Sequence, residues 1–331
     1  MNSAPSAFIA PHWARNRHLQ TVWAPLFRPL APAPRRRERL ALADGDFVNL
    51  DWVDAGDEGS PLVVLLHGLA GSGDSIYIVG MQHALRSAGI SSVTMIFRGA
   101  GGEPNRLART YHAGDTADLD ALLSGLIARF PQRPLAAVGY SLGGNVLLKH
   151  LGEQGAASPL RAACSVCAPI TLSVCADQLD VGLSRIYRDR LLRELLHNLA
   201  AKETALRAAG NRTEAERLHA LGDLSTIRSF RSYDGRVIAA LHGFRDADDY
   251  YRQSSARRFL PAIDTPTLLV HAKDDPFMTP DIAPQRHEAA PAVQLAVSPH
   301  GGHVGFVHGL PHRPRWWLEE TIPAWLAEQL R

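Results

Sequence analysis

Short apolar runs alternate with amphipathic stretches along most of the chain. The run at 62–66 is apolar at every position, which is typical of a strand buried on both faces of a sheet. The pattern predicts further strands at 90–97, 135–138, 162–166, 267–270 and 293–297. It predicts helices at 76–88, 115–129, 145–150 and 280–289. This alternation indicates an α/β fold with a doubly wound, mostly parallel sheet.

The two ends of the chain differ from this pattern. Residues 1–34 are rich in proline and in aromatic side chains, so we expect an arm that packs across the main domain. The segments 37–42 and 47–52, separated by Asp44-Gly45, predict a β-hairpin. The tail at 313–330 has apolar residues at helical spacing, which predicts a helix that caps the sheet.

The alternation stops between residues 172 and 259. This region is charged and shows helical spacing over 179–199 and 202–221, with no buried strand run. We interpret it as a helical insertion that forms a lid over the carboxyl edge of the sheet, where such folds bind ligands. The alternative is a group of helices packed beside the sheet, away from the site. The predicted organisation is an arm (1–34), an α/β-hydrolase core (35–171 and 260–331) and a lid (172–259).

Composition excludes several classes of protein. The formal net charge of +2 gives no field that would favour nucleic acid. The densest basic cluster, Arg35–Arg37 with Arg39, is interpreted as a solvated surface segment, with a membrane-surface or anionic-ligand role as the alternative. No apolar stretch approaches the ~20 residues of a membrane helix, and the first residues do not resemble a signal peptide. We therefore expect a cytoplasmic protein with no transmembrane segment.

The three cysteines do not indicate a disulfide framework or a metal site. Cys164 and Cys167 have the C-x-x-C spacing, but no second pair completes a zinc site. Cys164 falls within an apolar run. We predict that these thiols are buried and reduced, and that no metal is bound.

One motif carries most of the chemistry. Residues 139–143 read Gly-Tyr-Ser-Leu-Gly, between a predicted strand and a predicted helix. In that context Gly-x-Ser-x-Gly is a nucleophile elbow, whose tight turn exposes the serine and needs small residues two positions to either side. The following helix would direct its first N–H groups at developing negative charge. Ser141 is therefore the predicted nucleophile. The alternative is a glycine-rich turn that binds nothing.

A serine nucleophile needs a base, and the base needs a group that holds its tautomer. In α/β-hydrolases the chain order is serine, acid, histidine. Asp274 and Asp275 follow the strand at 267–270, and we choose Asp275 because it directly precedes Pro276. His300 and His303 follow the last predicted strand, and we choose His303 because two glycines before it form a flexible loop. Asp274 remains the alternative acid, and His300 is interpreted as a surface residue.

An oxyanion hole requires two backbone donors. We predict the N–H of Leu142, directly after the nucleophile, and the N–H of Leu69, in the turn after the strand at 62–66. The glycine-rich segment 98–102 lacks the Lys-Ser/Thr of a P-loop, so we predict a loop near the site and no nucleotide binding.

Several motifs together resemble the YheT-like α/β-hydrolases, also called the AB-hydrolase type 4 family. The resemblance covers about residues 8–310 and departs from the usual pattern at Arg17, where the family usually has proline. The matching segments are His18-Leu19-Gln20-Thr21 with Trp23, His67-Gly68-Leu69, Phe97-Arg98-Gly99, Tyr111-His112-Ala113-Gly114, Gly139–Asn145, Ala272–Phe277 and Gly301–Phe306. The resemblance implies hydrolysis of carboxylic esters on acyl or lipid-like substrates, by Ser141, Asp275 and His303.

These observations predict a serine carboxylester hydrolase that cleaves short- or medium-chain or lipid-like acyl esters through an acyl-enzyme. No metal or organic cofactor is expected, because the triad supplies nucleophile and base. The expected partner is a small acyl ester. An acyltransferase using the same triad and a non-catalytic binding protein on this fold are the alternatives.

Overall fold

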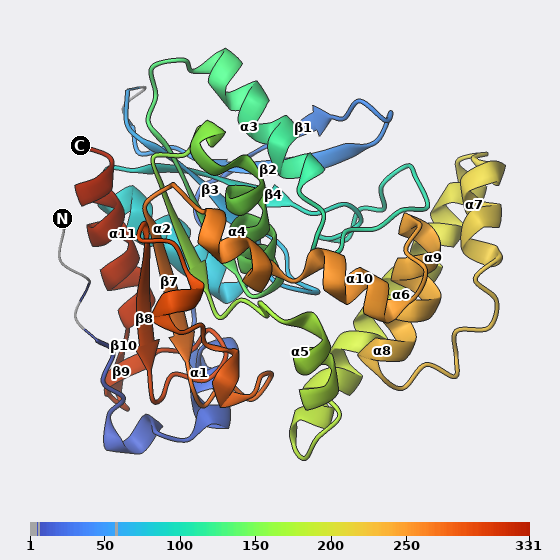
Figure 1. Ribbon diagram of the computed structural model, residues 1–331. Helices are drawn as coiled ribbons and strands as arrows, with labels where there is room; N and C mark the ends of the chain where they lie inside the picture. The colour runs from blue at the N-terminus through green and yellow to red at the C-terminus, as the bar shows by residue number, and fades with distance from the viewer. Residues whose placement is uncertain (1–4, 6, 57–58) are drawn as a thin grey trace.

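The computed structural model describes residues 5, 7–56 and 59–331, and its centre is an eight-stranded sheet (Figure 1). The strand order is β1-β2-β4-β3-β5-β6-β7-β8; β2 runs antiparallel to both β1 and β4, and the other pairs are parallel. The predicted hairpin and the doubly wound, mostly parallel sheet are thus confirmed. The strands are β1 (Arg36–Ala41), β2 (Phe47–Val53), β3 (Leu62–Leu66), β4 (Ser91–Ile96), β5 (Leu135–Tyr140), β6 (Ala162–Val166), β7 (Thr267–Ala272) and β8 (Val293–Ser298). A separate hairpin pairs β9 (Val307–Leu310) with β10 (Arg313–Trp316).

Helices surround the sheet and form a second group at its carboxyl end. The helices are α1 (Arg17–Phe27), α2 (Ile76–Ser87), α3 (Ala117–Arg129), α4 (Leu142–Gln154), α5 (Leu172–Gln178), α6 (Ser184–Ala208), α7 (Arg212–His219), α8 (Phe230–Tyr233), α9 (Ala239–His242), α10 (Ala247–Ser254) and α11 (Trp317–Gln329). A π-helical turn, η3 (Asp234–Ile238), joins α8 to α9. No helix in the described part of the chain is long and apolar enough to cross a bilayer.

The central strand β3 shows why both faces of the sheet are covered. Its side chains alternate: Val63 and Leu65 pack in one core cluster with α2 and α11, whereas Leu62, Val64 and Leu66 pack in another with α3 and α4. Every residue of β3 is buried. Successive side chains of a strand point to opposite faces, so an unbroken apolar run is what a doubly covered strand requires.

Four local predictions differ from the structure. The two helices predicted at 179–199 and 202–221 are instead one long helix, α6, followed by the short α7, because strong helix formers occupy the predicted break. The helix predicted at 280–289 is replaced by two 3₁₀ turns, since Pro284 interrupts helical hydrogen bonding between them. The tail begins with β10 before α11, and the arm contains the unpredicted α1.

A buried glutamine helps to fasten the N-terminal arm to β9 (Val307–Leu310). Gln20, in α1, donates from Nε2 to the carbonyl oxygens of Ala14 (2.8 Å) and Val307 (2.9 Å). Its Oε1 accepts from the N–H of Val307 at 2.7 Å. The side chain is fully buried, so all three bonds are shielded from water. Residues 1–4 and 6 of the predicted arm lie outside the described residues.

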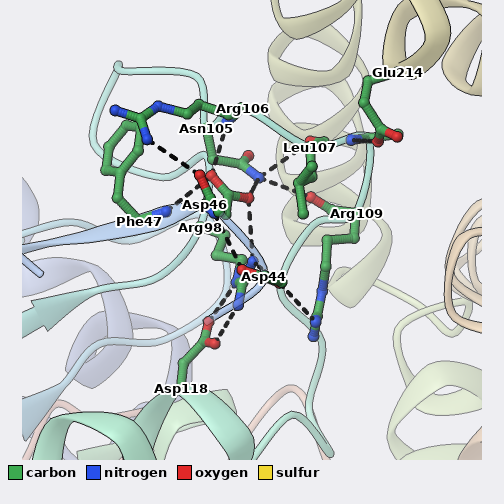
Figure 2. A network of polar contacts seen from close by, with 12 residues as sticks. Asp44, Asp46, Phe47, Arg98, Asn105, Arg106, Leu107, Arg109, Asp118 and Glu214 are labelled. Atoms are coloured by element: carbon green, nitrogen blue, oxygen red, sulfur yellow. Dashed lines mark hydrogen bonds and ion pairs between the residues drawn. The ribbon is translucent and has the colours of Figure 1, made fainter. Parts of the chain in front are cut away.

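A buried ion network holds the loop after β4 against the sheet (Figure 2). The guanidinium of Arg98 makes two bonds to Asp118, at 2.6 and 2.7 Å, and contacts Asp44 at 2.7 Å and Asp46 at 3.1 Å. Asp46 also accepts from Asn105 Nδ2 at 2.5 Å. Arg98, Asp46 and Asp118 are all buried. The network therefore joins the first hairpin to β4 and α3.

The insertion is attached to the same loop. Lys202, in α6, donates from Nζ to the carbonyl oxygen of Arg109 at 2.8 Å, and Glu214, in α7, accepts from the N–H of Ala108 at 2.6 Å. Burial lowers the pKa of Lys202 to about 7. The loop after β4 thus links the sheet to the helices of the insertion.

We expect the substitution Arg98→Met to lower the free energy of unfolding by about 3–5 kcal/mol, because it leaves buried carboxylates without their cation. Chemical denaturation measures the effect. The control is Arg129→Met, which removes an exposed pair with Glu38 and should cost at most about 1 kcal/mol. An equal decrease in the free energy of unfolding in the two variants would contradict the claim that the buried network stabilises the fold more than the exposed pair does.

We expect Gln20→Ala to lower the free energy of unfolding by about 2–4 kcal/mol, because the N–H of Val307 and two carbonyl groups lose their buried partner. The same denaturation experiment on Arg15→Ala, an exposed arm residue, serves as control. If both substitutions leave stability unchanged, Gln20 does not fasten the arm.

Candidate active site

Ser141 lies in a strained turn between β5 and α4. Its backbone has φ 51° and ψ −119°, a conformation that costs energy for any residue with a side chain. A Cβ atom at Gly139 would lie 2.4 Å from the carbonyl oxygen of Gly143. A Cβ atom at Gly143 would lie 2.6 Å from the carbonyl oxygens of Leu66 and His67. The turn therefore requires glycine at both positions, and it leaves Ser141 half-buried on the wall of a cavity.

Asp275 and His303 form a hydrogen-bonded pair. Nδ1 of His303 lies 2.7 Å from Oδ2 of Asp275, whose side chain is buried. Burial alone would raise the pKa of Asp275, but His303 and the N–H of Phe277 hold it below its ordinary value. The carboxylate therefore stays charged and accepts the Nδ1–H of the imidazole. His303 also lines the cavity that Ser141 faces.

Asp274 has a different set of contacts. Its Oδ1 accepts from the N–H of Gly302 at 3.0 Å, and its Oδ2 lies 3.3 Å from Nδ1 of His300. The side chain of His300 is 42% exposed, as expected for a surface loop residue. Asp274 thus shapes the loop that carries His303, whereas Asp275 contacts the imidazole itself.

The loop around His303 is supported on several sides. The N–H of His303 donates to Oγ1 of Thr21, in α1, at 3.0 Å. The ring of Phe277 stacks on the imidazole at a centroid distance of 4.0 Å and an angle of 9°. Beneath the loop, the buried Sγ of Cys167 accepts from the N–H of Val304 at 3.5 Å. These contacts hold the imidazole in one orientation.

The turn after β3 leaves one of its N–H groups unpaired. The N–H of Gly68 donates to the hydroxyl of Tyr77, and the N–H of Ala70 donates to the hydroxyl of Tyr111, both at 2.9 Å. The N–H of Leu69, between them, has no acceptor within the described residues. The N–H of Leu142, first in α4, likewise has none there. Both residues line the cavity beside Ser141.

His67 fixes the shape of this turn. Its Nδ1 donates to the carbonyl oxygen of Gly68 at 2.8 Å, and its Nε2 accepts from the N–H of Phe97 at 3.1 Å. Burial lowers the pKa of His67 to about 4, so the ring is neutral. A neutral ring with one donor and one acceptor satisfies both contacts.

Backbone strain gathers at this site. Within residues 7–56 and 59–331, the non-glycine residues with positive φ are Ala70, Ser141, Cys167, Val304 and Phe306. One lies in the turn after β3, one in the elbow, one beneath the histidine loop and two within that loop. Strained residues cluster where function requires a fixed geometry, so this distribution supports an active site here.

The cavity has a volume of about 320 Å³, at the small end of the range for ligand pockets. Its walls are largely apolar and come from the core, from α1 and from the insertion helices α5, α6 and α8. Asp234 is a polar exception on the insertion side. Burial raises its pKa to about 7, although the hydroxyl of Tyr251 donates to it at 2.7 Å.

Cys167, Asp275 and His303 place one ligand atom each within 4.8 Å of one another, which is compatible with a metal site in distance alone. Their chemistry does not fit one. Burial raises the pKa of Cys167 well above its ordinary value, so its sulfur stays protonated. Nδ1 of His303 is already paired with Asp275. We therefore interpret the three as an acid–base pair with a structural thiol.

Sequence reasoning missed the residues that position this chemistry. Thr21 belongs to the His18–Thr21 motif, which indicated a family but not a contact with His303. The hydroxyls of Tyr77 and Tyr111 accept hydrogen bonds from the N–H groups on either side of Leu69. No local pattern in the sequence marks either tyrosine for that role. A contact between distant segments leaves no periodic signal in a single sequence.

Comparison with known proteins identifies the family of this chain. The alpha/beta hydrolase fold family matches residues 61–310. YheT of Escherichia coli (strain K12), whose name marks it as a candidate esterase, is 41% identical over 99% of this chain and 95% of its own length. Phospholipase ABHD3 of Mus musculus is 29% identical over 94% of this chain and 75% of its own length.

Solved structures show the same fold. The esterase Pf2001 of Pyrococcus furiosus superimposes with a TM-score of 0.58 at 15% identity, covering 99% of this chain and 100% of that one. The predicted fold and the resemblance to the YheT-like proteins are both confirmed. The chain belongs to the α/β-hydrolase fold family, as an esterase- and lipase-type member related to YheT.

Proposed function

We propose that this protein hydrolyses carboxylic esters through an acyl-enzyme, with Ser141, Asp275 and His303 as its triad. The observation that carries the proposal is the 2.7 Å bond between Asp275 and His303, on a cavity that Ser141 also lines. The strained elbow and the two unpaired N–H groups beside it support the same chemistry. No metal or organic cofactor takes part in the proposed steps.

In the first half-reaction, Oγ of Ser141 attacks the ester carbonyl while Nε2 of His303 takes its proton. Asp275 holds the Nδ1–H and stabilises the imidazolium that forms. The N–H groups of Leu69 and Leu142 stabilise the tetrahedral oxyanion. The intermediate collapses, and the alcohol leaves with the proton from His303.

In the second half-reaction, water attacks the acyl-enzyme as His303 takes a proton from it. The same N–H groups stabilise the second oxyanion, and collapse releases the carboxylic acid and restores Ser141. The N-terminus of α4 adds its dipole, since Leu142 is the first residue of that helix. Each step uses groups fixed before substrate binds.

The cavity favours acyl esters with an apolar chain. Its walls from α5, α6 and α8 include Leu172, Leu195 and Phe230, whereas Asp234 provides a polar point. We propose that residues 172–259 form a lid whose inner face selects the acyl chain. The names of the relatives, a candidate esterase and a phospholipase, support short- or medium-chain or lipid-like esters. The three free, buried thiols agree with the proposed reducing cytoplasmic location.

We expect Ser141→Ala to lower kcat for p-nitrophenyl esters at least about 10³-fold, because the nucleophile is lost. A fluorophosphonate should label the wild-type protein and not this variant. The control is Ser87→Ala, which changes an exposed serine of α2 and should leave both readouts intact. An ester series from short to long acyl chains would size the cavity.

The outcome decides between the proposal and its alternatives. Wild-type protein that neither hydrolyses esters nor takes the label would favour a binding protein on this fold. Faster release of p-nitrophenol on adding an alcohol, with formation of a new ester, would identify an acyltransferase. A hydrolysis rate that Ser141→Ala leaves unchanged would contradict the triad.

We expect Asp275→Asn to lower kcat about 10³- to 10⁴-fold, because an amide in this position favours the wrong imidazole tautomer. Asp274→Asn is the matched control, because it makes the same change at the adjacent residue and leaves Asp275 intact. It should lower kcat less than about tenfold, since Asp274 contacts the loop and not the imidazole of His303. Steady-state kinetics on the same ester measures both. A larger loss in Asp274→Asn would transfer the acid role to that residue.

A further inference from the structure

Large apolar side chains that are exposed lie mostly along one edge of the molecule. In the part of the chain that the structure describes, they are Ile9, Leu26, Phe27, Ile127, Val181, Leu183, Ile186 and Leu310. All except Ile127 belong to the N-terminal arm, the segment from the end of α5 to the start of α6, or β9. These elements lie along the lower edge of the view in Figure 1, whereas α3, which carries Ile127, lies at the top.

The elements of this edge touch one another. Nδ1 of His18, in α1, lies 3.1 Å from the hydroxyl of Tyr187, in the first turns of α6. On its other side, the arm donates from Nε1 of Trp13 to the carbonyl oxygen of Gly309, in β9, at 2.9 Å. Their exposed side chains therefore belong to connected elements. We call Leu26, Phe27, Val181, Leu183 and Ile186 the α1–α6 surface.

Aromatic rings reinforce the arm side of this surface. Trp13 packs against Trp23 at a centroid distance of 4.7 Å, and Trp23 packs against Phe27 at 5.0 Å. Phe27 itself is 60% exposed. Tryptophan beside exposed phenylalanine is the composition that proteins place at the boundary between water and lipid.

The charge around the α1–α6 surface is positive. Residues 7–28 of the arm contain Arg15, Arg17 and Arg28 and no acidic residue, and Arg28 is paired with Glu319. Arg15 and Arg17 are exposed on the arm, and Arg185, Arg190 and Arg193 are exposed on α6. Among the described residues, none of these five forms an ion pair with an acidic side chain. The acidic residues Asp180 and Asp189 are paired with Arg188, and Glu194 of α6 is half-buried.

The active-site cavity reaches the same region. Thr21, Ala24, Pro25 and Arg28 of the arm line it, and Pro25 is also exposed on the outside of the molecule. The wall of the cavity that Pro25 forms is therefore next to Leu26 and Phe27 in the chain. On the opposite wall, Leu179 lines the cavity two residues before the exposed Val181.

We propose that the α1–α6 surface binds the surface of an anionic lipid bilayer and brings the α1 wall of the cavity close to it. The apolar side chains insert among the acyl chains at the boundary, and the surrounding arginines pair with anionic headgroups. The charge selects this occupant, because an uncharged surface or a second copy of this positively charged edge would leave the arginines unpaired. The delivery of lipid esters to Ser141 rests on the proposed function, whereas the binding itself does not.

The test is sedimentation of the full-length protein with vesicles of phosphatidylcholine, with and without phosphatidylglycerol. We expect binding to the anionic vesicles that weakens as salt rises, because screening reduces the attraction of the arginines. The double variants Leu26→Asp/Phe27→Asp and Leu183→Asp/Ile186→Asp should each weaken binding at least about tenfold. The matched control is Ile127→Asp, an exposed apolar residue on α3, which should bind as the wild type does.

Hydrolysis of a soluble p-nitrophenyl ester by every variant shows that each is folded, and it separates this proposal from the proposed function. If the wild type cleaves the soluble ester but does not bind anionic vesicles, only the proposed lipid binding by the α1–α6 surface is overturned. If the wild type binds anionic vesicles but cleaves no ester, the proposed lipid binding is supported and the proposed function is overturned. The proposal of lipid binding is also overturned if Ile127→Asp weakens binding as much as the double variants do. It is overturned as well if the wild type binds no vesicles but forms a dimer in size-exclusion chromatography, and the double variants are monomers.

Discussion

The close approach of the β5–α4 turn to the end of β3 is the constraint on which the site depends. The turn passes so near the carbonyl oxygens of Leu66 and His67 that only a hydrogen atom fits on Gly143. This approach forces Ser141 into its strained conformation and places the first N–H of α4 beside the turn after β3. The proposed nucleophile and the proposed oxyanion donors are thus positioned by one packing contact between two central strands.

The proposed base is positioned in a different way, by contacts from distant parts of the chain. Thr21 holds the N–H of His303, Asp275 holds its ring nitrogen, and Phe277 covers its face. The ion network around Arg98 fixes the loop after β4. The insertion is attached to that loop through Lys202, so the network also helps to hold the insertion helices in position. The sheet provides the rigid frame, and side-chain contacts between separate loops complete the site.

The sequence predicted the parts of this protein that local pattern determines. The apolar run of β3 and the elbow around Ser141 each require a particular residue type at each position, so both could be recognised directly. The break in α6 was predicted wrongly, although Ala200 and Ala201 at that point are strong helix formers that favour a continuous helix. The role of Gln20 could not be predicted, because its partner Val307 lies at the other end of the sequence. Only the position before Pro276 favoured Asp275 over Asp274, and the separate contacts of the two residues provide a physical distinction.

The bond between Gln20 and Val307 has a consequence for synthesis on the ribosome. Gln20 is synthesised 287 residues before Val307, so this partner is missing while all of the intervening chain is made. The loop that carries His303 therefore gains its support only when the C-terminal part of the chain emerges. A nascent chain that already contains the sheet and Ser141 still has no completed histidine loop, so the proposed nucleophile remains without its base until that loop has also been made.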